Sequence, residues 1–365
     1  MIVRKLLFEN FRNLETNFIE PKDGVNVIYG QNAQGKTNLL ESLWLFSGNR
    51  SFRGARDSEL IAFGKDQAKI SLDFLSENRE QNAEIIVSNS KKEYFLNKVC
   101  KNSASDISEA FSAVVFSPEH LTLVKGGPAE RRKFLDIAIF QNKRKYSFAL
   151  TKYNQTLTQR NALLKDILYH SELLGTLEIW DDRLATFGSY IIKERLDYIN
   201  NLNKTAKQFH SGISGGKEEL ELSYSESYVD DVESIKKAIL ENLIKSRKDD
   251  LNDRYTNIGP HREDLEITVN GLKARTFASQ GQQRSAVLSL KLSEASILNE
   301  TIGEKPVILL DDVLSELDNE RQDFLLNHLC GWQVFVTCCE ESSKEHLKNG
   351  RKFIVNNGKI SEING

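Results

Sequence analysis

A run near the N-terminus has the residue types and spacing of a phosphate-binding loop, or P-loop. Glycines frame it and a lysine and a threonine end it, in the order Gly30, Gln31, Asn32, Ala33, Gln34, Gly35, Lys36 and Thr37. The glycines let backbone N–H groups turn toward a β-phosphate, the lysine reaches the β- and γ-phosphates, and the threonine hydroxyl is a ligand for Mg²⁺. A chance glycine loop is the alternative. The agreement of all the fixed positions favours a nucleotide site instead.

The segments on either side of this loop are those that the motif requires. Val25–Tyr29 is a β-branched run typical of a buried strand, and residues 38–46 carry apolar side chains at helical spacing. The helical positions are Leu39, Leu40, Leu43 and Trp44. A strand, a glycine-rich loop and a helix in this order place the helix N-terminus at the phosphates, where its dipole favours an anion.

Two carboxylates follow a second apolar run, Pro306–Leu310. Such a run predicts a buried parallel strand, and doubly wound sheets place ligand sites at the carboxyl ends of their strands. We therefore assign Asp311, together with Thr37, to the shell of the Mg²⁺ ion. Asp312 is the candidate catalytic residue, because its carboxylate is placed to polarise the attacking water. The next predicted strand is Val334–Thr337.

A serine and a glutamine three residues apart open another helical region. Ser279 with Gln282 forms a capping box, and Gly281 between them allows the first turn to approach a ligand closely. Many ordinary helices begin in this way, so a purely structural cap is the alternative. If this helix end meets a γ-phosphate, it most simply comes from a second subunit, because the P-loop already occupies one side of the triphosphate. We therefore predict a homodimer that forms on ATP and shares its nucleotide sites.

Further cations occur in two loops near the P-loop. Arg12 and Asn13 lie in the turn between the first two predicted strands, where they are either solvated or in contact with the nucleotide. The glycine-bounded segment 48–56 contains arginines and one aromatic residue, which suits contact with the phosphates of a DNA strand. Its candidate DNA-binding residues are Arg50, Arg53 and Arg56.

The charged residues of one helical segment are all basic. Between Ile137 and Lys165 no acidic residue occurs, and aromatic residues lie among the cations. A solvated helix face over an aromatic core explains this pattern as well as a positive surface for duplex DNA does. In the second case the candidate DNA-binding residues are Lys143, Arg144 and Lys145.

The length of 365 residues is too great for one ordinary core, so we expect two lobes. We predict a split α/β ATPase lobe formed by residues 1–118 and 256–365, with a mainly helical lobe inserted at residues 119–255. Several interrupted helices, rather than one long helix, are expected in the insertion. The net charge of −3 gives no global attraction to DNA, so DNA binding must depend on a local patch or on a dimer.

The remaining composition suits a protein of the cytoplasm. The four cysteines show no metal or redox spacing, which fits a reducing environment. No apolar run approaches the roughly 20 residues that a membrane span needs, so no membrane association is expected. The N-terminal residues also lack the pattern of a signal peptide.

Taken together, the P-loop, the capped helix and the acid-ended strand resemble those of ABC-type P-loop ATPases, and within them the SMC-like group with its split head. Further segments resemble the RecF family of bacterial recombination mediators, and the similarity runs nearly end to end. They are Pro118-Glu119, Leu123–Pro128, Arg131–Asp136, Gly259–Arg262, Leu309–Asp312, Ser315–Asp318 and Arg321. The resemblance implies an ATP-dependent DNA-binding protein that dimerises on nucleotide, acts on duplex or gapped DNA at gaps and stalled forks, and works with RecR and RecO to load the RecA recombinase.

Three features depart from the wider ABC pattern. No lid glutamine is evident after Phe116, Thr337-Cys338-Cys339 stands in place of the switch histidine, and the catalytic acid is an aspartate instead of the more common glutamate. We infer slow hydrolysis that times a DNA clamp. His261 is a candidate substitute sensor, although a histidine beside Gly-Pro is more often structural.

Two other functions share the phosphate chemistry. A transporter ATPase subunit needs a membrane partner, and the helical insertion and the missing lid and switch residues count against it. A scaffold that binds ATP without hydrolysing it differs from the predicted ATPase only in turnover, which single-turnover assays measure.

Overall fold

The computed structural model describes residues 1–48, 50–89, 91–229, 231–339, 347 and 350–363, without the side chains of Asn142 and Arg144. The chain divides into two compact units. Unit 1 consists of Met1–Leu121, Gln208–Glu218 and Gln280–Gly365, and unit 2 consists of Thr122–Lys207 and Glu219–Ser279. Each unit therefore combines segments that are far apart in the sequence.

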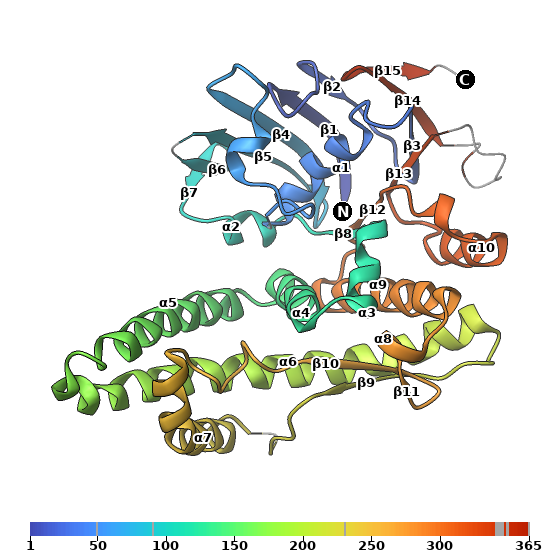
Figure 1. Cartoon of the computed structure of the whole chain (residues 1–365). Helices are drawn as coiled ribbons and strands as arrows, with labels where there is room; N and C mark the ends of the chain where they lie inside the picture. The colour runs from blue at the N-terminus through green and yellow to red at the C-terminus, as the bar shows by residue number, and fades with distance from the viewer. Residues whose placement is uncertain (49, 90, 230, 340–346, 348–349, 364–365) are drawn as a thin grey trace. The chain divides into compact units, whose positions relative to one another are not determined.

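Unit 1 contains a mainly parallel sheet with the strand order β15-β14-β3-β13-β12-β8 (Figure 1). The parallel strands are β14 (Arg351–Asn356), β3 (Val25–Tyr29), β13 (Val334–Cys338), β12 (Val307–Leu310) and β8 (Ala113–Phe116). At the edge, β15 (Lys359–Ile363) pairs antiparallel with β14. Strands β12 and β8 are buried along their whole length, which explains why they are apolar runs without alternation.

Helices of unit 1 pack on this sheet through leucines. α1 (Lys36–Trp44) starts two residues before the predicted segment 38–46 and passes into a 3₁₀ turn, Leu45–Ser47. α9 (Gln280–Ile302) and α10 (Asn319–His328) share a core with β12 and β13. The leucines that α9 and α10 bury in this core are Leu288, Leu292, Leu298, Leu325 and Leu326.

A second sheet of unit 1 is antiparallel, with the order β2-β1-β4-β5-β6-β7. Its strands are β1 (Ile2–Glu9), β2 (Asn17–Ile19), β4 (Gln67–Ser76), β5 (Arg79–Ser88), β6 (Lys92–Leu96) and β7 (Val99–Lys101). Buried residues alternate with less buried ones along β4, as expected when one face of a sheet packs on the core. Short helical turns of this unit are η2 (Asp57–Leu60), α2 (Ser105–Ser108), η3 (Pro118–Leu121) and η5 (Leu314–Glu316).

Unit 2 is mainly helical. Its helices are α3 (Thr122–Lys125), α4 (Pro128–Asn142), α5 (Arg144–Asp166), η4 (Ser171–Thr176), α6 (Leu177–Ser214, ending in unit 1), α7 (Val232–Asp253) and α8 (Ala274–Phe277). A small antiparallel sheet has the order β11-β10-β9, with β9 at Leu220–Tyr224, β10 at Leu265–Val269 and β11 at Leu272–Lys273. Figure 1 shows α5 and α7 beside the long α6.

α6 is a single helix of 38 residues, so the expectation of several interrupted helices is wrong for this segment. The glycine inside it, Gly188, marks a close approach of neighbouring helices. A Cβ at Gly188 would lie 3.3 Å from Tyr153 of α5 and 3.3 Å from Ile239 of α7. The absence of a side chain therefore lets these helices pack closely, and the helix continues through the glycine.

Fully buried ion pairs join the helices of unit 2. Arg160 of α5 donates to Asp181 of α6 at 2.8 Å and to Asp250 of α7 at 2.7 Å. Tyr146 and Tyr153 of the basic segment are also buried. Phe148 of the same segment is exposed, so its aromatic residues are core only in part, and the charge of Arg160 is used internally.

Two boundaries differ from the predicted lobes. Residues 256–279 belong to unit 2, because β10 pairs with β9 and places Leu265 opposite Tyr224. Gln208–Glu218 belongs to unit 1, where His210 lies 3.3 Å from Ser289 of α9. Both differences come from pairing between segments that are distant in sequence and therefore leave no local signal.

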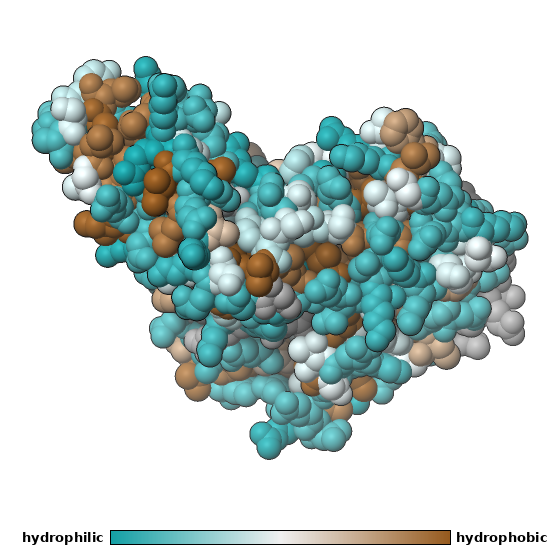
Figure 2. All heavy atoms as spheres, turned by 90° about the horizontal axis from the view of Figure 1, so that it is seen from below, coloured by the Kyte–Doolittle hydropathy of each residue, from teal (hydrophilic) through white to brown (hydrophobic). Residues whose placement is uncertain are grey.

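The face drawn in Figure 2 is largely hydrophilic, with apolar side chains in separate patches. The exposed apolar residues around η4 are Leu168, Tyr169, Leu174 and Ile179. Scattered apolar residues of this kind are ordinary for a protein surface. In the part of the chain that the structure describes, neither α6 nor any other helix is long and apolar enough to cross a membrane.

Candidate functional site

The carboxyl ends of neighbouring parallel strands bring the candidate residues together. Strand pairing sets Tyr29 of β3 beside Cys338 of β13, and Val336 of β13 beside Leu310 of β12. The P-loop follows Tyr29 and Asp311 follows Leu310. Both loops therefore leave the sheet at one edge, which is where parallel sheets bind their ligands.

The P-loop has a backbone shape that depends on its glycines. Gly30 and Gly35 have φ angles of +156° and +117°, a region that other residues rarely adopt. A Cβ at Gly30 would overlap the carbonyl oxygen of Val355, and one at Gly35 would lie 2.9 Å from the Oδ1 atom of Asn13. A larger residue at either glycine would therefore displace the loop.

The ammonium group of Lys36 lies inside the P-loop. Lys36 is 7% exposed, and its Nζ donates to the carbonyl of Gly30 and, at 3.2 Å, to that of Gln31. It also lies 3.4 Å from the Sγ atom of Cys339, which in turn donates to Asn32 Oδ1 at 3.0 Å. A buried cation surrounded by a loop of this shape is a suitable partner for a phosphate.

The remaining loop residues shape the same cradle. Ala33 has a φ of +65°, which turns the chain between the two glycines. The carbonyl of Gln34 accepts the N–H of Gly358 at 3.0 Å, which ties the loop to the turn between β14 and β15. Neighbouring strands therefore support the loop.

The two predicted metal ligands are in contact. Thr37 Oγ1 donates to Asp311 Oδ1 at 2.9 Å, and Thr337 Oγ1 donates to the same oxygen at 3.1 Å. Burial raises the pKa of the Asp311 carboxyl above its ordinary value, and the two hydroxyls offset only part of this increase. A divalent cation would stabilise the ionised form.

These oxygen donors fit Mg²⁺. Within the described ranges, no group of three or more His, Cys, Asp or Glu residues that could hold a metal occurs. Mg²⁺ usually needs only one or two carboxylates, because substrate phosphates and water complete its octahedral shell. Thr37 and Asp311 would hold the ion, and the triphosphate would supply further ligands.

Asp312 is held beside the metal ligands in an unusual conformation. Its φ angle is +53°, and its N–H donates to Thr337 Oγ1 at 2.8 Å. Its carboxylate accepts a hydrogen bond from Ser315 Oγ at 3.1 Å. Thr337 therefore orients both acidic residues, a role that the sequence does not suggest because the preceding run reads only as a buried strand.

Arg12 and Asn13 have specific partners, so neither is simply solvated. Arg12 donates to both carboxylate oxygens of the fully buried Glu41 on α1, at 2.8 and 3.0 Å. Asn13 donates to the carbonyl of Gln34 at 3.4 Å and accepts from Asn38 at 2.7 Å. Arg12 anchors the P-loop helix, and Asn13 lies directly against the P-loop.

One arginine of the predicted DNA-binding loop contacts the P-loop helix. Arg53 Nη1 donates to Asn38 Oδ1 at 3.1 Å, in the first turn of α1. Its charge also favours the ionised form of Asp311. All three arginines of the loop are exposed. The contact with Asn38 places Arg53 beside the P-loop helix.

The basic residues at the start of α5 are arranged differently from one another. Lys143 and Lys145 are both exposed, and Lys143 also forms an ion pair with Glu194 of α6. The side chain of Arg144 lies outside the described residues. Lys143 and Lys145 therefore both stay exposed candidates of this group, and Lys143 also has an acidic partner.

The predicted capped helix is α9. It begins at Gln280, so Ser279 stands at the cap position and Gly281 and Gln282 lie in the first turn. Ser279 is exposed. An exposed helix N-terminus is available to an external ligand or subunit.

His261 is held by groups of unit 2. Its Nδ1 lies 2.7 Å from the Tyr153 hydroxyl, and its Nε2 lies 3.0 Å from the carbonyl oxygen of Thr256. Burial lowers the pKa of His261 to about 4. A neutral ring with a hydrogen-bond partner at each nitrogen supports the structural alternative for His261.

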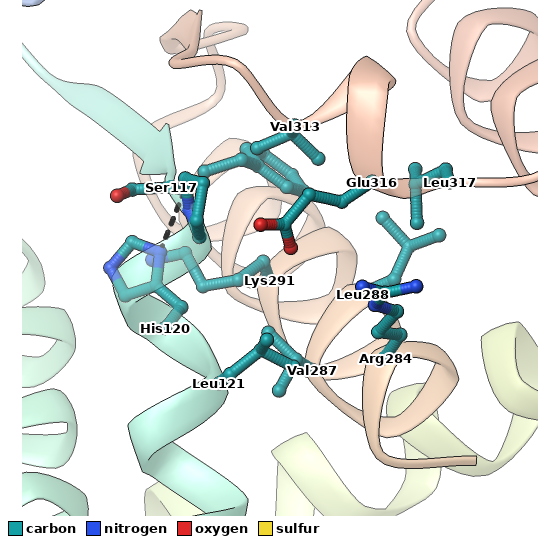
Figure 3. A pocket seen from close by; sticks show the side chains of 12 residues that line it. Ser117, His120, Leu121, Arg284, Val287, Leu288, Lys291, Val313, Glu316 and Leu317 are labelled. Carbon is teal, nitrogen blue, oxygen red and sulfur yellow. Dashed lines mark hydrogen bonds between the residues drawn. The ribbon is translucent and has the colours of Figure 1, made fainter. Parts of the chain in front are cut away.

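A small pocket lies in unit 1 between the end of β8, α9 and the turn after Asp312 (Figure 3). Ser117, which stands where the wider ABC pattern has its lid glutamine, lines the pocket and donates its N–H to His120 Nδ1 at 3.0 Å. Lys291 of α9 also lines the pocket and pairs with the buried Glu294. The position of the lid glutamine is therefore occupied by Ser117, whose backbone N–H is hydrogen-bonded to His120.

Comparison with known proteins gives the family. The family described as RecF/RecN/SMC N terminal domain matches residues 2–361. A protein from Agathobacter rectalis named DNA replication and repair protein RecF is 42% identical over 366 residues, covering 100% of this chain and 99% of the relative. The protein of the same name from Thermoanaerobacter pseudethanolicus is 42% identical over 363 residues, covering 99% of each chain.

Solved structures agree with this assignment. A structure described as the recombination mediator protein RecF-ATP in the RecFOR pathway has a TM-score of 0.93 and 39% identity, covering 100% of this chain and 98% of that one. An SMC head domain from Pyrococcus furiosus has a TM-score of 0.56 at 16% identity, covering 99% and 96%, and shares the fold alone. The fold is thus that of an ABC-type, SMC-like ATPase head, and the chain belongs to the RecF family.

Proposed function

We propose that the chain binds ATP with Mg²⁺ and uses slow hydrolysis to control a homodimer on DNA during replication and recombinational repair. The observation that carries the proposal is the 2.9 Å hydrogen bond from Thr37 Oγ1 to Asp311 Oδ1, which joins the P-loop to the acid-ended strand. The relatives named DNA replication and repair protein RecF, and the solved RecF-ATP structure, support it.

In this proposal each residue of the site has its own role in ATP binding or hydrolysis. Lys36 exchanges its carbonyl partners for oxygens of the β- and γ-phosphates. Thr37 and Asp311 hold Mg²⁺, which neutralises charge that develops on the phosphates. Asp312 orients the attacking water and accepts its proton. Arg53, beside the first turn of α1, is a further candidate to contact the nucleotide.

DNA, RecR and RecO are the proposed partners, with loading of the RecA recombinase as the outcome. The description of the solved relative as a mediator in the RecFOR pathway supports RecR and RecO. The candidate contacts to DNA phosphates are the exposed Arg50, Arg53, Arg56, Lys143 and Lys145. Because the net charge is −3, such local contacts must act together, which a dimer favours.

The shared nucleotide site can be tested at the start of α9. Ser279→Arg places bulk and charge where the helix end must meet the ATP of a second subunit. We expect the ATP affinity of the monomer to stay near that of the unchanged protein while ATP-dependent dimerisation is lost. Sedimentation velocity with and without ATP and duplex DNA measures the dimer, and binding of a fluorescent ATP analogue measures the affinity.

Two controls accompany this variant. Ser171→Arg adds the same charge at another exposed serine and should leave dimerisation unchanged. A mixture of Ser279→Arg with Lys36→Ala should restore at most one composite site per dimer. If Ser279→Arg still dimerised normally on ATP, the shared-site model would fail and Ser279 would be a purely structural helix cap.

Cys339 offers a second test of where the nucleotide binds. Its exposed thiol lies 3.4 Å from Lys36 Nζ, so a triphosphate in the P-loop should cover it. With Mg-ATP at about ten times its dissociation constant, alkylation of Cys339 by N-ethylmaleimide should slow about tenfold. Peptide mass spectrometry follows Cys339, with the exposed Cys100 and Cys330 as internal controls that should react at unchanged rates. Equal reaction of Cys339 with and without ATP would place the nucleotide elsewhere.

A further inference from the structure

A side-chain hydrogen bond joins the segment after Asp312 to helix α9. Arg321 Nε donates to Ser285 Oγ at 2.9 Å. Arg321 lies in the first turn of α10, and Ser285 lies in the second turn of α9. Both residues belong to unit 1. The bond therefore connects the helix whose N-terminus is proposed to meet ATP with the segment that carries the candidate base.

The segment between Asp312 and Arg321 is fixed at both ends. At its start, Ser315 Oγ donates to the carbonyl of Asp312 at 2.7 Å and to its carboxylate at 3.1 Å. At its end, Asp318 caps α10 by accepting the N–H of Arg321 at 3.0 Å, and it also pairs with the Arg321 guanidinium. Gln322 donates to two carbonyls of the turn, at 2.6 and 2.9 Å. A displacement of Arg321 is thus transmitted to Asp312.

The acceptor lies close to the functional end of α9. Ser285 is fully buried, and at about 1.5 Å per residue it stands only ~8 Å from the start of the helix. Figure 3 shows the same juxtaposition from the pocket, with Glu316 and Leu317 of the turn lying near Arg284 and Leu288 of α9. The first turns of α9 and the turn after Asp312 therefore form one surface.

We propose that Arg321 is a positioning residue for ATP hydrolysis, holding the Asp312 carboxylate and the N-terminal turn of α9 in a fixed mutual orientation. The inference rests on the proposed function, because it concerns the same nucleotide site. A guanidinium suits this task, since its rigid fork bonds Asp318 and Ser285 at the same time, which a lysine ammonium cannot do with the same geometry. The leucines of α9 and α10 pack independently of this bond, so its loss changes orientation rather than folding.

The acceptor provides the cleaner variant. Ser285→Ala removes the hydroxyl, keeps the Arg321–Asp318 pair and retains a good helix former. We expect kcat for ATP hydrolysis to fall about tenfold, with the ATP dissociation constant and the melting temperature unchanged. Ser293→Ala is the matched control, because Ser293 is an equally buried serine of α9 whose hydroxyl donates to the carbonyl of Ser289 within the same helix. This control should hydrolyse ATP at the normal rate.

A double-mutant cycle with Arg321→Ala completes the test. If the two side chains act through their mutual bond, the double variant loses no more activity than the more impaired single variant. Additive losses, or a Ser285→Ala rate equal to that of Ser293→Ala, would overturn the positioning role. The unchanged protein is measured in parallel. Its failure to hydrolyse ATP with DNA present would contradict the proposed function instead.

Discussion

Replacement of Lys36 by alanine is expected to abolish ATP binding. The ammonium group is buried in the P-loop, where it donates to backbone carbonyls and lies beside a thiol, so a phosphate that enters the loop gains its charged partner from Lys36. Loss of charged hydrogen bonds to the β- and γ-phosphates should lower the affinity at least about 100-fold. Equilibrium binding of a fluorescent ATP analogue measures this change directly.

Lys36→Met separates the charge from the packing of the side chain. The methionine keeps an apolar stem of similar length beside Gly30, where the Lys36 Cδ atom lies near the position of a Cβ. Both variants should lose the rise in melting temperature that ATP gives the unchanged protein, because only a ligand that binds the folded state stabilises it. ATP affinity retained by Lys36→Met would mean that packing, and not charge, makes the site.

The central sheet and the P-loop could be predicted because their signals are local. β3 and β12 are apolar runs, and the P-loop shape is fixed by glycines at positions where φ is positive. The order of the strands in the sheet is not determined by local sequence. One register sets Tyr29 beside Cys338, in a segment about 300 residues away, and another sets Val336 beside Leu310; together these registers bring the P-loop to Asp311.

Contacts between segments that are distant in the sequence account for the features of the site that sequence reasoning could not predict. Arg53 is predicted as a DNA contact because basic loops commonly bind phosphates, and no local pattern indicates that its guanidinium donates to Asn38 of α1. The sequence leaves open whether Arg12 is solvated or contacts the nucleotide. In the structure Arg12 pairs with the buried Glu41. Thr337 reads as one more β-branched strand residue, and only its position next to β12 reveals that it bonds Asp311 and Asp312.

Replacement of Asp312 by asparagine is expected to stop turnover while ATP binding is kept. Asparagine tolerates the positive φ of +53° at this position and can still accept the hydrogen bond from Ser315, so the local shape should persist. It cannot accept a proton from water, and loss of a general base typically lowers kcat by about 100-fold or more. Single-turnover release of phosphate, with and without DNA, measures the change.

Asp311→Asn is the matched comparison, because it makes the same replacement of a carboxylate by an amide at the neighbouring residue. Asp311 accepts hydrogen bonds from Thr37 and Thr337 and is the proposed metal ligand, so this variant should weaken Mg²⁺-dependent ATP binding itself. Asp312→Asn should instead accumulate as an ATP-bound dimer on DNA, since hydrolysis is the step proposed to release it, and sedimentation would detect this species. Unchanged hydrolysis in Asp312→Asn would remove its assignment as the base, whereas hydrolysis absent from the unchanged protein as well would favour the non-hydrolysing scaffold.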